Sequence, residues 1–204
     1  MFGEGAGADL TTGEHNIAMG YHALYQGTTE TNDNVAIGYN TMSGGWTTAS
    51  VIDCVVIGSG AGAGALVAGA SGSTLIGKDA GAAITEGIQN TAIGYLAMDA
   101  NTDGDYNTAV GASALSTMDV AGTAGNVAVG HAALRDCSTG IKNTIVGAFS
   151  GTTLTLADEC TFVGYAAGGD GAIIASADGS VGIGAFALND LTSGAGNTAI
   201  GYQC

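Results

Sequence analysis

One pattern recurs along the whole chain and limits what it can fold into: a five-residue stretch of the type Asn-Thr-Ala-Ile-Gly appears eleven times. The copies align on their last residue, a glycine, and successive glycines are 17 to 20 residues apart. A repeat this short cannot bury its apolar side chains alone, so each copy must stack on its neighbours. We call the aligned residues the phase glycines and count the positions of each repeat from them; they are Gly20, Gly38, Gly58, Gly77, Gly94, Gly111, Gly130, Gly147, Gly164, Gly184 and Gly201.

The residues before each phase glycine alternate as in a short strand. Position −1 is Met, Ile or Val in every copy, and position −3 is Ile, Val or Thr in every copy. β-Branched side chains with a period of two predict a strand. Strands that recur without helices between them stack in parallel, about 4.8 Å apart. The sequence therefore predicts an all-β fold, a parallel β-solenoid (β-roll) of about eleven coils of 17 to 20 residues.

The repeats leave little of the chain unassigned. We expect residues 1–15 to form a short leader into the first coil and residues 16–204 to form a single solenoid domain. The pattern is still in phase at the last residue, so we expect the solenoid to continue beyond the chain or to stack end to end.

A column of asparagines begins the strands. Position −4 is Asn in seven copies and Ser or Cys in the other four. Stacked Asn side chains can hydrogen-bond to the copies above and below, so we predict a ladder that fixes the register. Cys54 and Cys160 occupy this column, and we interpret them as replacements of ladder Asn, because the four cysteines show no disulfide or zinc-binding pattern. The phase glycine is expected where the chain turns sharply or two backbones approach closely.

Two further columns exchange large and small side chains. In six coils position +4 is Leu or Met and position −2 is Ala or Gly, whereas in four coils position +4 is Gly and position −2 is large. Close-packed interiors tolerate neither voids nor overlaps, so the two positions should share one packed space. The four coils of the second type also carry extra apolar residues further on, which predicts a core filled from different directions. The large residues at position −2 are Val56, Leu75, Ile145 and Phe162.

The strands carry apolar residues on both faces, as expected when both faces are covered. A narrow coil has only one inside. We therefore expect the second covered face to contact another chain in a homo-oligomer.

Charge and composition exclude several classes of partner. Three basic residues stand against eighteen acidic ones, a formal net charge of −15. Such a surface repels phosphate, which argues against nucleic acid and against anionic lipid. The N-terminal residues show no secretory signal, and the long uncharged stretch of residues 54–77 is too rich in glycine for a membrane-spanning helix.

Three motifs suggest chemistry but fit the repeat better. Residues 55–64 look like a strand followed by a dinucleotide-binding glycine loop, yet the helix that this motif needs is not indicated. The acidic stretch 99–106 lacks the spacing of a calcium loop, so we expect a solvated loop. No acid, base or nucleophile recurs beside a histidine, so we expect no enzyme, no cofactor and surface positions for His15, His22 and His131.

One aromatic column remains as a candidate contact. It is either an aromatic stripe that binds a glycan or a protein, or a subunit contact that covers the turn. The tyrosines directly after a phase glycine are Tyr21, Tyr39, Tyr95, Tyr165 and Tyr202.

The repeated motif N-T/V-A-I/V-G-Y-x-A-L, on a chain rich in Gly and Ala, resembles the YadA-like head repeats of trimeric autotransporter adhesins and the related repeats of phage tail fibres. The resemblance covers essentially the whole chain. It implies a left-handed β-roll, three chains around one axis, and a role in attachment. The adhesin heads have shorter and more uniform repeats, and from residues 1–204 we expect neither a coiled-coil stalk nor a membrane anchor within this segment.

Together these features predict a structural or adhesive fibre segment, extracellular, on a virion fibre or a bacterial surface. It would present weak contacts to a cell-surface glycan or protein receptor several times over. An alternative is a self-assembling filament whose subunits stack end to end. An ice-binding solenoid ranks last, because it needs an exposed Thr array and we expect the Thr residues of position −3 to face inward.

Overall fold

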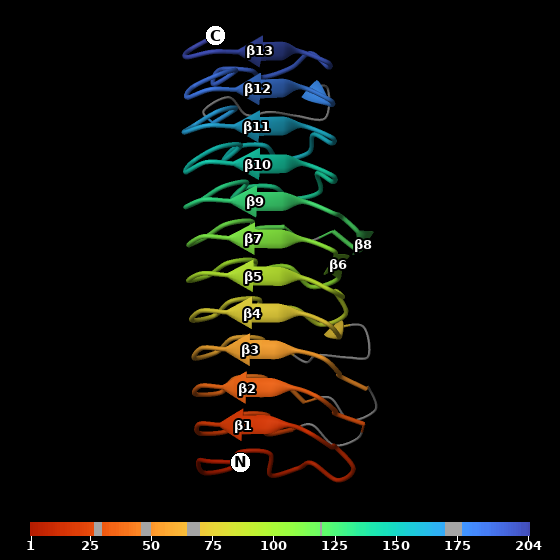
Figure 1. The fold of residues 1–204 in the computed structure, drawn as a ribbon. Coiled ribbons are helices and arrows are strands. Elements are labelled where there is room, and N and C mark those ends of the chain that lie inside the picture. The colour runs from red at the N-terminus through yellow and green to blue at the C-terminus, as the bar shows by residue number, and fades with distance from the viewer. Residues whose placement is uncertain (27–29, 46–49, 65–69, 119, 170–176) are drawn as a thin grey trace.

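The computed structural model describes residues 1–26, 30–45, 50–64, 70–118, 120–169 and 177–204. Eleven three-residue strands form one parallel sheet that runs along the whole stack (Figure 1). The predicted all-β parallel solenoid is confirmed. The strands of the sheet are β1 (Ile17–Met19), β2 (Val35–Ile37), β3 (Val55–Ile57), β4 (Thr74–Ile76), β5 (Thr91–Ile93), β7 (Thr108–Val110), β9 (Val127–Val129), β10 (Thr144–Val146), β11 (Thr161–Val163), β12 (Val181–Ile183) and β13 (Thr198–Ile200).

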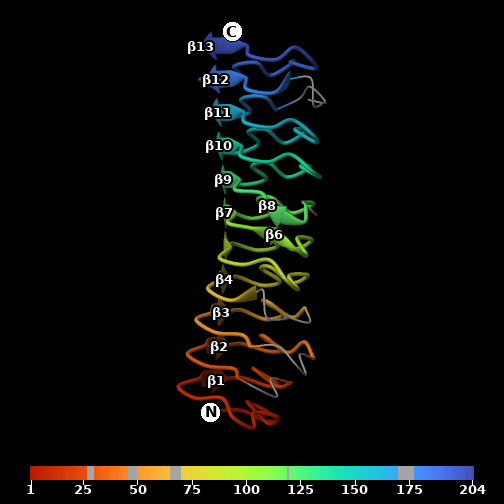
Figure 2. The same cartoon turned by 90° about the vertical axis from the view of Figure 1, so that its right-hand side faces the viewer.

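The strands are stacked in sequence order and in register, so that equivalent positions of neighbouring repeats pair. In β5 and β7, for example, Ala92 lies opposite Ala109. A second sheet consists of the two short strands β6 (Gly104–Asp105) and β8 (Gly122–Thr123), which are also parallel. Figure 2 shows the strands of the long sheet along one side of the stack and the longer connections on the other.

Residues 1–15, which we expected to be a leader, extend the stack below β1. The N–H of Phe2 donates to the carbonyl of Ala18 at 2.8 Å, and the N–H of Gly20 donates to the carbonyl of Phe2 at 2.7 Å. Phe2 thereby forms a parallel bridge to Met19. The leader is thus paired with the first coil.

Each strand of the long sheet except the last, β13, buries its middle residue, and all turn their two outer residues away from the core. In β7, Ala109 is fully buried while Thr108 and Val110 are half-buried. The expectation that the Thr residues of position −3 face inward is therefore wrong. In a three-residue strand the alternation leaves only one side chain inside, and the volume exchange already places position −2 there.

The turns depend on residues in the left-handed backbone conformation, which the residue types at these positions do not predict. Positions −5, +2 and +4 take φ values from 48° to 71° in every described coil, and most of these residues are not glycine. This geometry points the N–H groups of positions +2 and +4 toward opposite neighbouring coils. Ser113 at position +2 donates to Tyr95 O in the coil before it (2.9 Å), and Leu115 at position +4 donates to Ala133 O in the coil after it (3.0 Å). The turns are therefore held by inter-coil hydrogen bonds, as the strands are.

The phase glycines lie where two backbones approach, as predicted. Gly130 has φ of 135°, and a Cβ built on it would lie 2.6 Å from the carbonyl oxygen of Gly147 in the next coil. No other residue type fits this combination of backbone angle and distance.

The exchange of volume between positions −2 and +4 is confirmed by direct contact. A Cβ on Gly168 would lie 2.5 Å from the ring of Phe162, and a Cβ on Gly151 would lie 3.2 Å from Ile145. The Phe162 ring also needs Gly182 of the next coil, where an added Cβ would be 3.0 Å away. Coils of this type bury extra apolar residues, as expected, with Ile84 and Leu154 fully inside. The corresponding residues of two other coils, within 65–69 and 170–176, lie outside the described residues.

The asparagine ladder is confirmed as well. The N–H of Asn143 donates to Asn126 Oδ1 at 2.9 Å, and Asn143 Oδ1 accepts the N–H of Cys160 at 2.9 Å. Asn126 Nδ2 donates to the carbonyl of Gly140, at position −7 of the next coil, also at 2.9 Å. Where Cys replaces Asn, the thiol takes over this second contact, with Cys160 Sγ 3.4 Å from Ala177 O. Each ladder residue therefore links two coils.

Candidate functional site

The outward face of the long sheet is an uncharged, largely apolar strip. Positions −3 and −1 of the eleven strands supply it, and all of them are Ile, Val, Met or Thr. Several remain substantially exposed, including Ile17 at 50%, Ile93 at 36% and Ile183 at 39%. By the spacing of paired strands the strip is about 50 Å long. Monomeric soluble proteins rarely expose a continuous apolar surface of this extent.

The five predicted tyrosines are all exposed at the turn after the strand, but they do not form one cluster. Tyr21 and Tyr39 stack with ring centroids 5.4 Å apart. Tyr95 lies apart from them, and the ammonium group of Lys78 is 5.5 Å from its ring centroid. Tyr165 and Tyr202 belong to a separate row of rings in the last coils.

The structure gathers a row of aromatic rings that the tyrosine column alone did not indicate. The row runs through five consecutive coils at the end of the chain, with neighbouring centroids 4.9, 5.9, 5.4 and 6.1 Å apart and edge-to-face packing. Phe149 and Phe186 stand at position +2 and alternate with rings at position +1. Reading columns +1 and +2 together in the sequence would have found it. The row consists of His131, Phe149, Tyr165, Phe186 and Tyr202.

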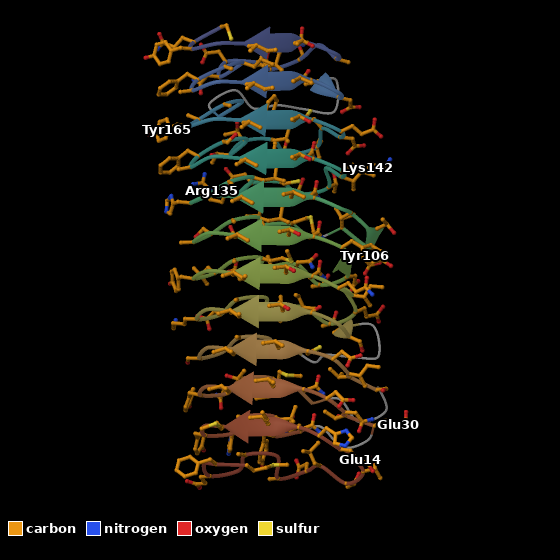
Figure 3. All side chains as sticks on the ribbon, viewed as in Figure 1. Glu14, Glu30, Tyr106, Arg135, Lys142 and Tyr165 are labelled. Carbon is orange, nitrogen blue, oxygen red and sulfur yellow. The ribbon has the colours of Figure 1, made fainter. Side chains whose placement is uncertain are left out.

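A groove of about 340 Å³ lies beside the middle of this row. One wall is aromatic, and the other comes from positions +5 and +6 of coils seven to nine. Figure 3 shows Tyr165 and Arg135 on the turn side of the stack, opposite Tyr106 and Lys142. The lining residues are Arg135, Phe149, Thr152, Thr153, Tyr165, Ala166, Gly169 and Phe186.

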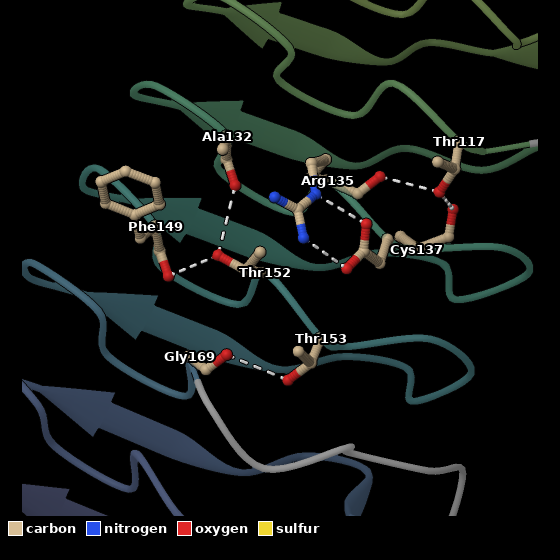
Figure 4. A network of polar contacts seen from close by, with 9 residues as sticks. Thr117, Ala132, Arg135, Cys137, Phe149, Thr152, Thr153 and Gly169 are labelled. Carbon is tan, nitrogen blue, oxygen red and sulfur yellow. Dashed lines mark hydrogen bonds and ion pairs between the residues drawn. The ribbon is translucent and has the colours of Figure 1, made fainter.

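Hydrogen bonds fix the polar wall of the groove (Figure 4). The Arg135 guanidinium makes a two-point contact with the Asp136 carboxylate, at 2.7 and 2.8 Å, and this contact raises the pKa of Arg135. The Thr152 hydroxyl donates to the carbonyl of Phe149 at 2.6 Å, and the Thr153 hydroxyl donates to that of Gly169 at 3.0 Å. The hydroxyl donors are thus used within the wall, while the Thr152 oxygen keeps acceptor capacity.

A second groove, of about 440 Å³, lies at the last coil. Its lining combines the apolar side chains of Phe186, Leu188 and Leu191 with the polar groups of Asn189 and Gln203. Among the described residues that line it, Asp190 has the one charged side chain.

The motifs that suggested chemistry serve the stack instead. In the acidic stretch 99–106, Asp103 accepts the hydroxyl of Thr85 at 2.9 Å and Asp105 accepts the N–H of Ile88 at 3.0 Å. Residues 55–64 pass from β3 into turns, without the helix that a dinucleotide site needs. Within the described ranges, no three His, Cys, Asp or Glu residues come together as metal ligands.

The three histidines lie on the surface of three separate turns. His15 pairs with Asp33 at 3.1 Å, and His22 stacks on Tyr21 with ring centroids 3.9 Å apart. His131 packs against Phe149. Their neighbours are carboxylates and aromatic rings.

Comparison with models of known protein families, with curated proteins and with solved structures finds no match. Among the residues that the structure describes, no helix has the length and apolar character needed to cross a bilayer.

Proposed function

We propose that this chain is a structural and adhesive segment of an extracellular fibre, assembled as a homotrimer through the outward face of the long sheet. The observation that carries the proposal is the uncharged strip formed by positions −3 and −1. Covering it removes a row of Ile and Val side chains from water, which contributes about 25 cal/mol per Å² of apolar area. The resemblance to adhesin heads and phage tail fibres supplies the number three.

The proposed function is mechanical and multivalent. A stack held by strand pairing, by the turns and by the asparagine ladder is a stiff rod. With the sheet at the centre, three copies of the turns and acidic connections would face outward. Contacts that are weak individually then add up through avidity. A virion fibre or a bacterial surface adhesin is the setting in which such a rod attaches to a cell.

A second function gains support from the outward Thr residues. Six of the eleven residues at position −3 are Thr, and they face outward in one column of the stack, two of them exposed and four half-buried. An ice-binding face requires a regular outward array of Thr. The neighbouring column at position −1 is entirely Ile, Val or Met. Such bulky apolar side chains suit a protein contact better, so this function ranks below the fibre segment. The six threonines are Thr74, Thr91, Thr108, Thr144, Thr161 and Thr198.

Sedimentation equilibrium at micromolar concentration tests the assembly. The chain should sediment with three times its monomer mass. The double variant Ile93→Glu/Ile183→Glu places charges on the strip and should sediment as a folded monomer, with an unchanged circular dichroism spectrum. The matched variant Ala100→Glu, at an exposed position of a connection, should remain assembled.

Each alternative has its own outcome in this experiment. A folded wild-type monomer contradicts the trimer, and thermal-hysteresis activity in that monomer would then favour ice binding. Open-ended polymers whose length grows with concentration would favour the end-to-end filament instead.

A further inference from the structure

We infer that the groove beside the aromatic row binds a neutral saccharide, a ligand class that deepens the proposed attachment function and rests on it. The groove combines the exposed rings of Phe149 and Tyr165 and the half-buried ring of Phe186 with a fixed polar wall. Sugars have one apolar face made of C–H groups and a rim of hydroxyls, and this groove offers a matching surface to each.

The aromatic wall is preorganised by its own packing. Tyr165 contacts Phe149 and Phe186 edge to face, with centroids 5.9 and 5.4 Å apart. Tyr165 nevertheless remains 51% exposed. Aromatic side chains have few rotatable bonds, so ordering them costs little on binding. A ring fixed by its neighbours but open on one side is suited to stack against the C–H face of a sugar.

The opposite wall supplies hydrogen-bonding groups in fixed positions. Arg135 is held by two bonds to Asp136, so its remaining N–H groups keep one orientation. The hydroxyl oxygen of Thr152 is an acceptor at the same wall. Hydroxyl pairs of a sugar need donors and acceptors side by side, and the remaining N–H groups of Arg135 with the Thr152 oxygen provide both.

Charge favours a neutral sugar over an acidic one. The chain carries a net charge of −15, and Arg135, the one cation among the described lining residues, is neutralised by Asp136. An anionic ligand would therefore meet repulsion that this paired cation does not offset. The groove, about 340 Å³, is at the small end of ligand pockets, so it fits a short part of an oligosaccharide.

Saturation-transfer NMR can test the inference by titration of the intact protein with the neutral trisaccharides maltotriose, cellotriose and mannotriose. A trimer of galacturonic acid is titrated in the same way as the anionic comparison. We expect dissociation constants in the millimolar range. At least one neutral trisaccharide should therefore give a signal at a sugar concentration of about 10 mM. Tyr165→Ala should weaken its binding at least tenfold, whereas Tyr165→Phe should retain it. Tyr39→Ala removes an equally exposed ring outside the groove and should leave binding unchanged.

Three results overturn the inference: no signal with any neutral trisaccharide, a signal unaffected by Tyr165→Ala, or stronger binding of the acidic trimer. Circular dichroism of Tyr165→Ala shows whether a loss of signal comes from unfolding. Because the groove is built within one chain, the titration can succeed with the monomeric Ile93→Glu/Ile183→Glu variant. Failure of sugar binding and failure of assembly are thereby separate outcomes.

Discussion

At the scale of single residues, the columns with one strict requirement could be predicted from the sequence. The phase glycine allows no Cβ, and the ladder position needs a side chain that both donates and accepts, so each column shows its role by its letters. The left-handed positions +2 and +4 could not be predicted. They hold residues as different as Asp79, Leu115 and Phe149, because inter-coil hydrogen bonds impose the backbone angle whatever the side chain.

Two glycine substitutions separate backbone strain from steric overlap. Gly94 has φ of 141°, and an added Cβ would lie 2.5 Å from the carbonyl oxygen of Gly111. Gly94→Ala should lower the free energy of unfolding by about 3 kcal/mol or more. Gly125 has φ of 62° and open space around it, so Gly125→Ala should cost only about 1–2 kcal/mol. Chemical denaturation measures both, and equal losses would contradict a close approach of the backbones.

At the scale of the strand and its coil, the sequence predicted which positions share the core but not which way the threonines face. Volume exchange is a relation between two columns, so it identifies the inside directly. The residues at positions −3 and −1 are Ile, Val, Thr and one Met. Side chains of these types occur in strands whether the face on which they lie is covered or open. The residue type of Thr108 therefore gives no sign of its orientation, which follows only from its alternation with Ala109, whose column the volume exchange places inside.

The shared core space can be tested with a double variant in β7. Ala109 and Leu115 are both fully buried. Ala109→Phe alone should cost about 1–3 kcal/mol through overpacking. Leu115→Gly alone should cost about 2–5 kcal/mol through the cavity it leaves. In the double variant, the introduced ring should fill the cavity. The introduced glycine also suits the left-handed backbone that Leu115 adopts in the wild type (φ 52°). We expect the double variant to be more stable than either single variant.

Additivity of the two costs, measured by chemical denaturation, would show that the positions do not share space. Leu115→Gly with Ala92→Phe is the matched control, since it places the ring in the preceding coil. This control should recover less stability than the pair within one coil.

At the scale of the whole molecule, the strip and the aromatic groove differ in how far they could be foreseen. The strip follows from repetition of one strand, so the second apolar face was predicted from the letters. The groove depends on Arg135, Phe149 and Tyr165 from three different coils. These residues belong to different columns, and only the stacking distance and the turn geometry bring them together.

The solenoid also predicts the reactivity of its thiols. Cys54, Cys137 and Cys160 are buried, and Cys204 is exposed. Burial raises the pKa of the Cys137 thiol to about 12, so its reactive thiolate is scarce in the folded protein. Ellman's reagent at pH 8 should therefore modify one thiol quickly in the native state and all four in guanidinium. Cys204→Ser should remove the fast phase.

The same burial makes the fold sensitive to alkali, and the sign follows from linkage. The folded state keeps the Cys137 proton above pH 9, where an exposed thiol loses it. The unfolded state then binds fewer protons, so stability is complete below about pH 9 and falls as the pH rises toward 12. Cys137→Ala should reduce this alkaline loss relative to wild type, whereas Cys204→Ser should not.

The three buried thiols should react with Ellman's reagent in a fixed order. Each coil contacts only its neighbours, so opening of the stack spreads from its ends. Cys137, which lies further from either end than Cys54 or Cys160, should react last, and simultaneous reaction of all three would indicate a single all-or-none unit.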